Sequence, residues 1–597
     1  MSTYEARLSA LREQLRADRL DGFVVPLTDE HMSEYVGTYA QRLAWLTGFQ
    51  GSAGSAVVLP EEAAIFTDGR YMLQVRDQVD GRHWSYESVP ETSVADWLHE
   101  HAGEGARIGY DPWLHTRDWV KKAKEALADK GAELVAVRRN PIDAVWADKP
   151  EPSRARLVPH PDDYAGKSSA AKRADMADWL KEQKADAAVL SALDSIAWTF
   201  NVRGQDVEHT PVALSFAIVN ADGTADLFVE PEKIGEDVRQ HLGNAVRVHD
   251  RASFPGHLAQ LGGKAVVVDP ERAVAAIFDA LGAAGAKVLA KRDPAVLPKA
   301  IKNEAEVAGH RAAQARDGAA LTRFLHWLSV EAPNGELDEL KAADRLLRFR
   351  QAAGDLRDTS FDTISGAGPN GAIVHYRVSE ETNRPIEMNS IYLVDSGGQY
   401  PDGTTDVTRT VAIGEPTAEM RDRFTRVLKG HIAVAAAVFP DGTRGSQLDS
   451  FARQFLWRAG LDYAHGTGHG VGSYLAVHEG PQRISPAGSS QSGGDEPLRA
   501  GMILSNEPGY YKTGEYGIRV ENLVLVVPLE VEGAEKKMLG FETLTFAPID
   551  RKLIEPALLT AEERDWIDSY HAKVLEVVAP QLDGEALDWA GAACAPL

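Results

Sequence analysis

The sequence predicts an α/β and α+β multidomain protein, and three observations lead to this prediction. The chain has 597 residues, which is too long for one hydrophobic core and indicates about three domains. An apolar fraction of 44% and a charged fraction of 25% are typical of globular domains. The N-terminal half repeats one helix–strand pattern, whereas long helices and hairpins fill the C-terminal half. We therefore expect domains at residues 1–155, 156–300 and 301–597.

Each N-terminal copy is expected to begin with an amphipathic helix followed by a short strand. A helix near residues 8–20 precedes a strand at 22–25, and a helix at 176–184 precedes a strand at 187–190. Each copy continues with a tryptophan-containing segment, a pair of strands and a further helix. The stretch 147–166 between the copies is rich in proline and charge, as linkers are. The pattern therefore predicts two copies of one α/β unit.

Composition excludes several classes of function. The chain carries 88 acidic and 64 basic residues, a formal charge of −24, which argues against a nucleic-acid partner. A single cysteine, Cys594, permits neither an intrachain disulfide nor a cysteine-based zinc site. The charged N-terminus has no secretory signal pattern, and the apolar run 432–439 is too short to span a membrane. We expect a cytoplasmic protein without a membrane partner.

Residues 391–413 predict a β-hairpin with a long connection, around which the C-terminal half is organised. Strand-forming residues occupy 391–394 and 407–413, and glycine, proline and aspartate lie between them. Asp395 ends the first strand and Asp406 opens the second, so the hairpin brings two carboxylates together. Close carboxylates repel each other unless a cation lies between them. A metal site explains this pair, and the alternative is that both are ordinary turn and strand-end aspartates.

Histidines gather in the segment HGTGHGVGSYLAVHEGP, which contains His465, His469 and His478. Glycine allows the backbone to approach a ligand closely, and neutral imidazole is a common ligand of divalent metals. The alternative is a glycine-rich loop with solvated histidines. Upstream, His375 interrupts the apolar run 372–376, where it fits a hydrogen-bonded core histidine as well as a catalytic one.

Two glutamates follow or interrupt predicted strands further along the chain. Glu507 comes after the strand 502–505, and Glu521 lies in the β-branched run 518–527. A carboxylate in so apolar a strand is costly unless it is paired or binds a metal. Arg519 lies two residues earlier and on the same face, so a plain Arg519–Glu521 ion pair is the alternative.

The candidate metal ligands are four carboxylates and one imidazole: Asp395, Asp406, His469, Glu507 and Glu521. This set is rich in oxygen and lacks a thiolate, unlike a typical structural zinc site. It suits two divalent metal ions, Mn²⁺ first, with Co²⁺ or Zn²⁺ as alternatives.

The same segments resemble a known family. DSGGQYPDGTTDVTRT, HGTGHGVGSYLAVHEGP, SNEPGYY and GIRVEN, with GAIVHY and AWTFNVRGQDVEHTPV upstream, are similar to the pita-bread metallopeptidases. The similarity is greatest to the three-domain cytosolic Xaa-Pro aminopeptidases and covers essentially the whole chain. It implies two creatinase-like N-terminal domains, a C-terminal pita-bread catalytic domain and a homodimer. It also implies hydrolysis of peptides with proline at the second position, through a hydroxide bridging two metal ions.

The resemblance assigns a role to each candidate ligand. Asp395 would bind one ion alone, Asp406 and Glu521 would bridge both ions, and His469 and Glu507 would complete the second. Glu507 would also act as the general base.

Further residues receive substrate roles from the resemblance. His375 would assist the leaving group or the tetrahedral intermediate, and His465 and His478 would line the substrate site. We also expect Arg42, just before the first tryptophan segment, to reach a substrate site. The glycine- and serine-rich loop 484–494 looks longer than the family pattern and could alter access to the site.

Three other functions compete with this prediction. A prolidase-type Xaa-Pro dipeptidase shares the metal ligands but has one N-terminal domain, so the repeat argues against it. Non-catalytic pita-bread binding modules have lost ligands that this chain retains. A creatinase-like amidinohydrolase is metal-free and would lack the five-residue set.

Overall fold

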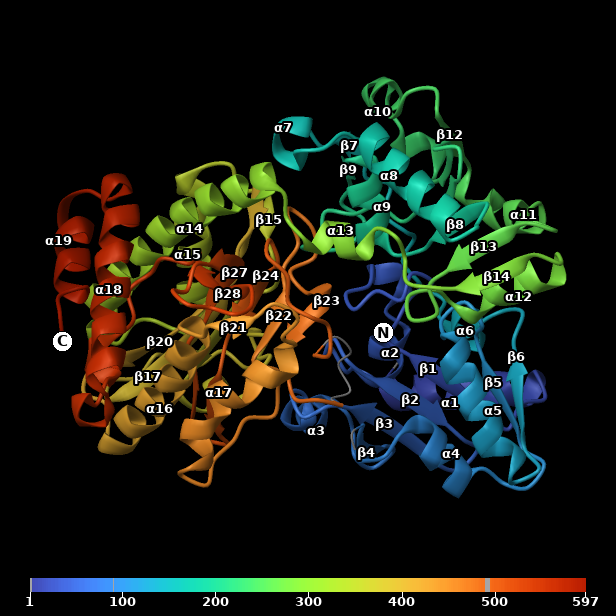
Figure 1. The fold of residues 1–597 in the computed structure, drawn as a ribbon. Coiled ribbons are helices and arrows are strands. Elements are labelled where there is room, and N and C mark those ends of the chain that lie inside the picture. Colours follow the sequence, from blue (N-terminus) through green and yellow to red (C-terminus); the bar gives the residue numbers. More distant parts are fainter. Residues whose placement is uncertain (1–2, 90, 489–493) are drawn as a thin grey trace. The chain divides into compact units, whose positions relative to one another are not determined.

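A computed structural model describes residues 3–89, 91–488 and 494–597 (Figure 1). The chain divides into two compact units, Met1–Val296 and Leu297–Leu597, which we call unit 1 and unit 2. None of the described helices is long and apolar enough to cross a membrane.

Unit 1 contains two mixed six-stranded sheets. The first has the order β4 (Ser85–Ser88), β3 (Ala63–Thr67), β2 (Ser55–Val58), β1 (Gly22–Pro26), β5 (Arg107–Tyr110) and β6 (Glu133–Ala136). The second has the order β12 (Val246–His249), β11 (Ala225–Phe228), β10 (Phe216–Asn220), β8 (Ala187–Leu190), β13 (Ala265–Val268) and β14 (Lys287–Ala290). In both sheets the central strand pairs antiparallel with one neighbour and parallel with the other. The predicted repeat is therefore confirmed.

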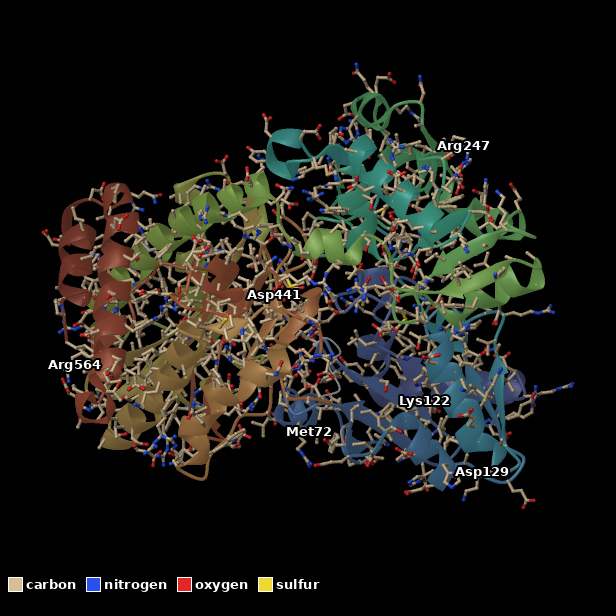
Figure 2. All side chains as sticks on the ribbon, viewed as in Figure 1. Met72, Lys122, Asp129, Arg247, Asp441 and Arg564 are labelled. Carbon is tan, nitrogen blue, oxygen red and sulfur yellow. The ribbon has the colours of Figure 1, made fainter. Side chains whose placement is uncertain are left out.

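The strands of the first sheet bury side chains on both faces. Helix α1 (Tyr4–Ala17) packs three leucines against Phe23 and Val25 on one face. The alternate residue Val24 points to the other face, toward Trp97 of α4 (Val94–His101) and Leu127 of α5 (Arg117–Ala128). This double coverage explains why the inner strands β1, β2 and β3 are largely apolar instead of alternating with polar residues. Figure 2 shows charged side chains such as Lys122 and Asp129 extending outward from this unit.

The polar segment 201–209 of unit 1 contributes to a buried network. Lys172 of α8 (Ser169–Glu182) donates to Asn201 Oδ1 over 2.6 Å. The same ammonium group donates to the carbonyl of Trp198, in the last turn of α9 (Leu193–Phe200). Asp206 forms an ion pair with Lys233, and both side chains are fully buried. Buried charges are tolerated when they are paired in this way.

Long capped helices frame unit 2. The predicted helices are present as α14 (Glu304–Glu331), α15 (Glu339–Ala353), α16 (Ala418–Ala435) and α17 (Gly445–Trp457), and α18 (Ala561–Val578) and α19 (Gly584–Ala593) follow near the C-terminus. Asn303 caps α14 and forms a reciprocal box with Glu306, while Thr417 caps α16. These caps satisfy backbone N–H groups that a helix start otherwise leaves unpaired.

Two sheets of unit 2 carry the candidate site. The first orders β16 (Ile364–Ala367), β17 (Ser390–Ser396) and β20 (Val407–Ile413). The second orders β21 (Phe439–Pro440), β28 (Met538–Thr543), β27 (Asn522–Leu529), β24 (Ile503–Asn506), β22 (Gly468–Gly470) and β23 (Glu479–Ile484). A separate hairpin pairs β25 (Gly509–Lys512) with β26 (Tyr516–Arg519), and β15 (Asp358–Thr359), β18 (Gly398–Tyr400) and β19 (Gly403–Thr404) form a small third sheet.

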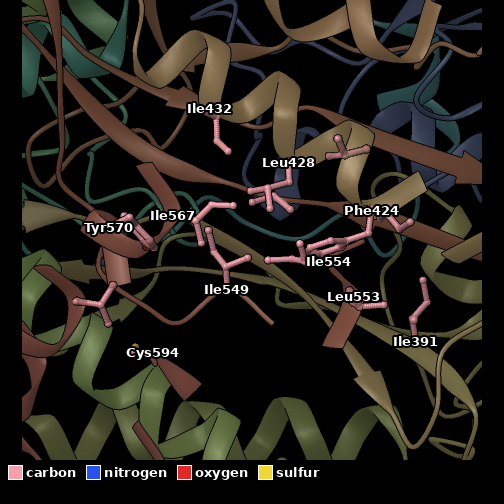
Figure 3. Packing of buried hydrophobic residues seen from close by; sticks show 14 of the residues in the cluster. Ile391, Phe424, Leu428, Ile432, Ile549, Leu553, Ile554, Ile567, Tyr570 and Cys594 are labelled. Atoms are coloured by element: carbon pink, nitrogen blue, oxygen red, sulfur yellow. The ribbon is translucent and has the colours of Figure 1, made fainter. Parts of the chain in front are cut away.

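An apolar core joins the first sheet to the helices of unit 2. Ile391 of β17 belongs to the same buried cluster as Phe424 and Leu428 of α16 and Ile567 and Tyr570 of α18 (Figure 3). Each such side chain contributes about 1.5–3 kcal/mol when it is fully buried. This packing supports the strand from which Asp395 projects.

Candidate metal centre

The predicted hairpin is present and brings its two aspartates together. Strands β17 and β20 are antiparallel, with Asp395 opposite Thr408 and Ser396 opposite Val407. Asp406 directly precedes β20, so it lies across the hairpin from Asp395. Both carboxylates are buried, with exposed fractions of 7% and 4%.

The second sheet supplies the other three candidate ligands. His469 lies in β22, and Glu507 directly follows β24. Glu521 lies between β26 and β27, which belong to different sheets, so the single strand predicted at 518–527 is wrong. The chain changes sheet at Val520 and Glu521, and apolar periodicity cannot reveal this break because both flanking strands are buried.

Donor atoms of three of these residues converge. Atoms of Asp406, His469 and Glu521 that can bind a metal all lie within 4.8 Å of one another. His469 Nε2 lies 3.4 Å from Asp406 Oδ2 and 3.5 Å from Glu507 Oε1. Asp395 adds its charge to this group, since it contributes to the raised pKa of Asp406. Donor atoms of four predicted ligands therefore lie together, and the hairpin places Asp395 across from Asp406.

The imidazole of His469 is held with Nε2 toward this region. Its Nδ1 lies 2.9 Å from the carbonyl oxygen of Gly470, which can only accept, so Nδ1 carries the proton. Nε2 is then the unprotonated nitrogen, as metal binding requires. The hydroxyl of Ser505 accepts from the His469 backbone N–H and donates to Glu507 Oε1 over 3.0 Å. Ser505 thus connects two candidate ligands.

Burial and mutual repulsion raise the pKa of three carboxyl groups above their ordinary values. For Asp406, desolvation is the largest cause and the charge of Asp395 the next. For Glu521, desolvation again leads, followed by Asp406 and Asp395. The pKa of Glu507 is raised by burial, against the opposing charges of His469 and Arg519. A protein that keeps these groups ionised at neutral pH needs additional positive charge among them.

Two oxygen atoms mark where that charge fits. Asp395 Oδ1 and Glu521 Oε1 are buried and have no hydrogen-bond partner among the described residues. The second oxygen of each group is satisfied, by Arg519 over 2.7 Å and by Thr408 over 2.7 Å respectively. An orphaned buried carboxylate oxygen is costly, and a bound cation removes that cost. The residues present therefore fit divalent metal ions.

Arg519 and Tyr511 also belong to the site, although the sequence assigned them no role there. Arg519 donates to Asp395 and to the hydroxyl of Tyr511, each over 2.7 Å, so the alternative Arg519–Glu521 ion pair is replaced by other partners. Tyr511 in turn lies 2.8 Å from His465 Nε2. The pairing of β25 with β26 places Gly509 opposite Arg519. Recognising this hairpin from its connection Thr513, Gly514 and Glu515 would have placed Tyr511 and Arg519 on paired strands.

The remaining predicted histidines lie at different distances from the cluster. The ring of His478 is 4.3 Å from that of His469, measured between centroids, and 6.5 Å from that of His375. His465 donates through Nδ1 to the carbonyl of Gly466 over 2.7 Å, which leaves Nε2 to accept from Tyr511. The structure thus places His478 beside the candidate ligand His469, and His375 near His478. His465 is connected to the candidate ligand Asp395 through Tyr511 and Arg519.

Arg42 belongs to unit 1, where its guanidinium binds Asp143 through two hydrogen bonds of 2.8 and 2.9 Å. Lys149 shares the same carboxylate over 2.8 Å. A substrate role for Arg42 stays a prediction. In the loop 484–494, residues 489–493 lie outside the described part of the chain, so the expected effect of this loop on access stays a prediction as well.

The sequence and the fold are both similar to those of known proteins. The family model of "Metallopeptidase family M24" matches residues 308–528. Two family models of the "Creatinase/Prolidase N-terminal domain" match residues 7–144 and 148–306. A probable Xaa-Pro aminopeptidase P of Laccaria bicolor is 41% identical, over 99% of this chain and 93% of its own length. The chain belongs to metallopeptidase family M24.

Two further relatives match most or all of this chain. Aminopeptidase P2 of Arabidopsis thaliana is 42% identical, over 95% of this chain and 84% of its own. A crystal structure of X-prolyl aminopeptidase from Caenorhabditis elegans, described as a cytosolic enzyme with a di-nuclear active site, superposes with a TM-score of 0.95. It is 35% identical and covers 100% of both chains. The predicted fold, two creatinase-like domains and a pita-bread domain, is confirmed.

Proposed function

We propose that this M24 enzyme is a metal-dependent Xaa-Pro aminopeptidase, which removes the first residue from peptides with proline at the second position. The observation that carries the proposal is the buried acidic cluster with two unpartnered oxygens, Asp395 Oδ1 and Glu521 Oε1. The names of the relatives from three kingdoms support the substrate class. The X–Pro bond is a tertiary amide without an N–H, so a dedicated site is needed to cleave it.

The five ligands are assigned to two divalent ions. Asp395 would hold one ion, Asp406 and Glu521 would serve both ions, and His469 and Glu507 would complete the second. Four carboxylates and one imidazole favour Mn²⁺, with Co²⁺ or Zn²⁺ as alternatives. When bound, such ions act as Lewis acids that activate water and stabilise negative charge on a carbonyl oxygen.

The protein side chains position and move protons around this centre. Glu507 acts as the general base, and its Oε1 is held by the hydroxyl of Ser505. His375 assists the leaving amine or the tetrahedral intermediate, and His478 lines the substrate site. The ring of His478 packs near those of His375 and His469, at centroid distances of 6.5 and 4.3 Å. His465, held by Tyr511, lines the substrate site.

Further parts of the proposal extend to the whole molecule. We assign the domains to residues 1–155, 156–300 and 301–597, a homodimeric assembly and a cytoplasmic location. The two repeated sheets of unit 1 support the domain division, and the cytosolic relative from Caenorhabditis elegans supports the location. A prolidase-type dipeptidase is disfavoured because the chain carries two creatinase-like domains.

A substrate comparison tests the proposal directly. Purified enzyme, stripped with a chelator and reloaded with Mn²⁺, is assayed on a Xaa-Pro-Xaa tripeptide and on the matching Xaa-Pro dipeptide. We expect metal-dependent release of the first residue from the tripeptide and little turnover of the dipeptide. Preference for the dipeptide would identify a prolidase, and cleavage of neither peptide after reloading would refute the proposal.

A further inference from the structure

An ion pair on α17 reaches the segment that carries the histidines. Asp449 and Arg453 are four residues apart on this helix, and their side chains are only 5% and 4% exposed. Arg453 Nε lies 2.7 Å from Asp449 Oδ2, and Nη2 lies 3.2 Å from Asp449 Oδ1. The pair is therefore bidentate and shielded from water.

The remaining N–H groups of Arg453 bind the chain just before the metal ligand His469. Nη1 donates to the carbonyl of Tyr463 over 2.7 Å and to Asp462 Oδ1 over 2.9 Å, and Nη2 donates to the carbonyl of His465 over 2.6 Å. All five N–H donors of this guanidinium thus have acceptors. The ring of Tyr463 lies beneath the same guanidinium at 3.9 Å. A lysine at this position has neither the fork nor the number of fixed donors.

Asp449 extends the contact to a second candidate ligand. Thr467 donates its hydroxyl to Asp449 Oδ1 over 2.7 Å and accepts from the hydroxyl of Tyr463. The carbonyl of Thr467 in turn accepts from the backbone N–H of Glu507 over 2.8 Å. The next residue, Gly468, lies so close to β24 that an added Cβ would meet the carbonyl oxygen of Ser505 at 2.0 Å. A small displacement of Thr467 is therefore transmitted to the general base.

We propose that Asp449 and Arg453 are positioning residues of the aminopeptidase site, which fix His465 through its carbonyl and Glu507 through Thr467. They contact neither metal nor substrate and act through the segment 463–467. The proposal rests on the proposed function, because it takes Glu507 as the base and His465 as a substrate residue. Groups that orient ligands and bases in this way typically change metal affinity or activity by about 10–100-fold when they are altered.

Two conservative substitutions test this positioning role. Thr467→Val removes the hydroxyl link to Asp449 but keeps the shape of the side chain and the carbonyl that holds Glu507. Arg453→Lys keeps the charge but removes the fork. Thr322→Val is the control for the first, because its buried hydroxyl binds Gly318 within α14. Lys429→Met is the control for the second, because Lys429 pairs with Glu563 of α18 at a partly buried site.

The readouts are kcat, KM, bound metal and the melting temperature of each variant after Mn²⁺ loading. We expect Thr467→Val and Arg453→Lys to lower kcat about 10–100-fold with a smaller change in KM, because the misplaced base is needed in the transition state. The controls are expected to lower the melting temperature without a comparable loss of kcat. Equal kcat in test and control variants at equal loss of melting temperature would overturn the positioning role.

Glu507→Gln separates this failure from failure of the proposed function. If that variant is inactive while Thr467→Val behaves like its control, the site assignment stands and the positioning role is wrong. If Glu507→Gln is fully active, the site assignment itself is wrong. Should Arg453→Lys fold poorly, Thr467→Val alone decides the outcome.

Discussion

Both units bury clusters of charge, but they neutralise them differently. In unit 1, Glu30 pairs with Arg251, and Asp206 pairs with Lys233. Burial works to raise the pKa of Glu30, but the neighbouring His31 and Arg251 lower it to about 2. In unit 2, the pKa of Asp406 is instead raised well above its ordinary value, by burial and by Asp395.

This comparison indicates which of the two clusters needs a cation from outside the protein. The carboxylates of Glu30 and Asp206 in unit 1 meet arginine and lysine side chains of the protein itself. In unit 2, four carboxylates gather around one imidazole and the guanidinium of Arg519. Buried charges are retained when they are paired or bind metals. A surplus of buried negative charge is thus the physical signature of the metal centre, and breaking each cluster should have a different consequence.

The largest expected effect is on catalysis in unit 2. Glu507→Gln removes the proton acceptor and one anionic ligand, so kcat on a Xaa-Pro-Xaa peptide should fall by about 10²–10⁴-fold. Circular dichroism should show an unchanged fold. Glu515→Gln, an exposed site in the same hairpin region, serves as the control and should retain activity. Wild-type turnover by Glu507→Gln would exclude this residue as the base.

The next effect is on stability in unit 1. Lys233→Met leaves the fully buried Asp206 without its cation, which should lower the free energy of unfolding by about 3–5 kcal/mol. Chemical denaturation with hydrogen exchange of unit 1 peptides measures this loss. The metal content of the folded protein should not change, because the cluster of unit 1 is neutralised internally. Loss of bound metal in this variant would contradict the conclusion that the unit 1 cluster is neutralised independently of the metal centre.

Metal removal should act on unit 2 in a pH-dependent way. Saturating metal at 100 times its Kd stabilises a fold by about 2.7 kcal/mol. In the metal-free protein, the carboxyl groups of Asp406, Glu507 and Glu521 have higher pKa values in the folded state than in the unfolded state. Their contribution to the free energy of unfolding is therefore fully present below the unfolded carboxyl pKa of about 4. It is lost as the pH rises through the pKa values of the folded state. The melting-temperature gap between loaded and chelated protein should therefore widen from pH 5 to pH 8. A gap that narrows over this range would contradict the raised pKa values.

The smallest effect comes from His31 in the cluster of unit 1. Burial lowers its pKa to about 4, with Glu30 opposing and Arg251 adding to the shift. Stability from the neutral imidazole is present above the unfolded pKa of about 6.5 and is lost as pH falls toward 4. Relative to His31→Gln, wild type should lose about 1.4 kcal/mol per pH unit over this range. Denaturant titrations of both proteins at pH 7.5 and 5 measure the change, and a pH-independent difference would refute it.

Sequence patterns predicted the elements of both units because their periodicity and turn residues are local signals. The hairpin that joins Asp395 to Asp406 and the helices of unit 2 follow from such signals. The break at Glu521 was missed because strands of two different sheets adjoin without a turn residue between them. The contact between Tyr511 and His465 joins segments that are distant in sequence, so it depends on tertiary packing, which residue spacing does not encode.

The metal content of the protein shows whether the acidic cluster of unit 2 binds two ions. Three proteins are compared: wild type, Asp406→Asn and the control Asp226→Asn. The control alters an aspartate that is paired with Arg247 in unit 1. Each protein is equilibrated with Mn²⁺ and desalted, and its metal content is measured by inductively coupled plasma mass spectrometry. We expect two Mn²⁺ ions per chain in wild type and in the control. We expect fewer than two ions in Asp406→Asn, because an amide is a weaker ligand than the carboxylate proposed to serve both ions. Two ions retained by Asp406→Asn, or none bound by wild type, would contradict it.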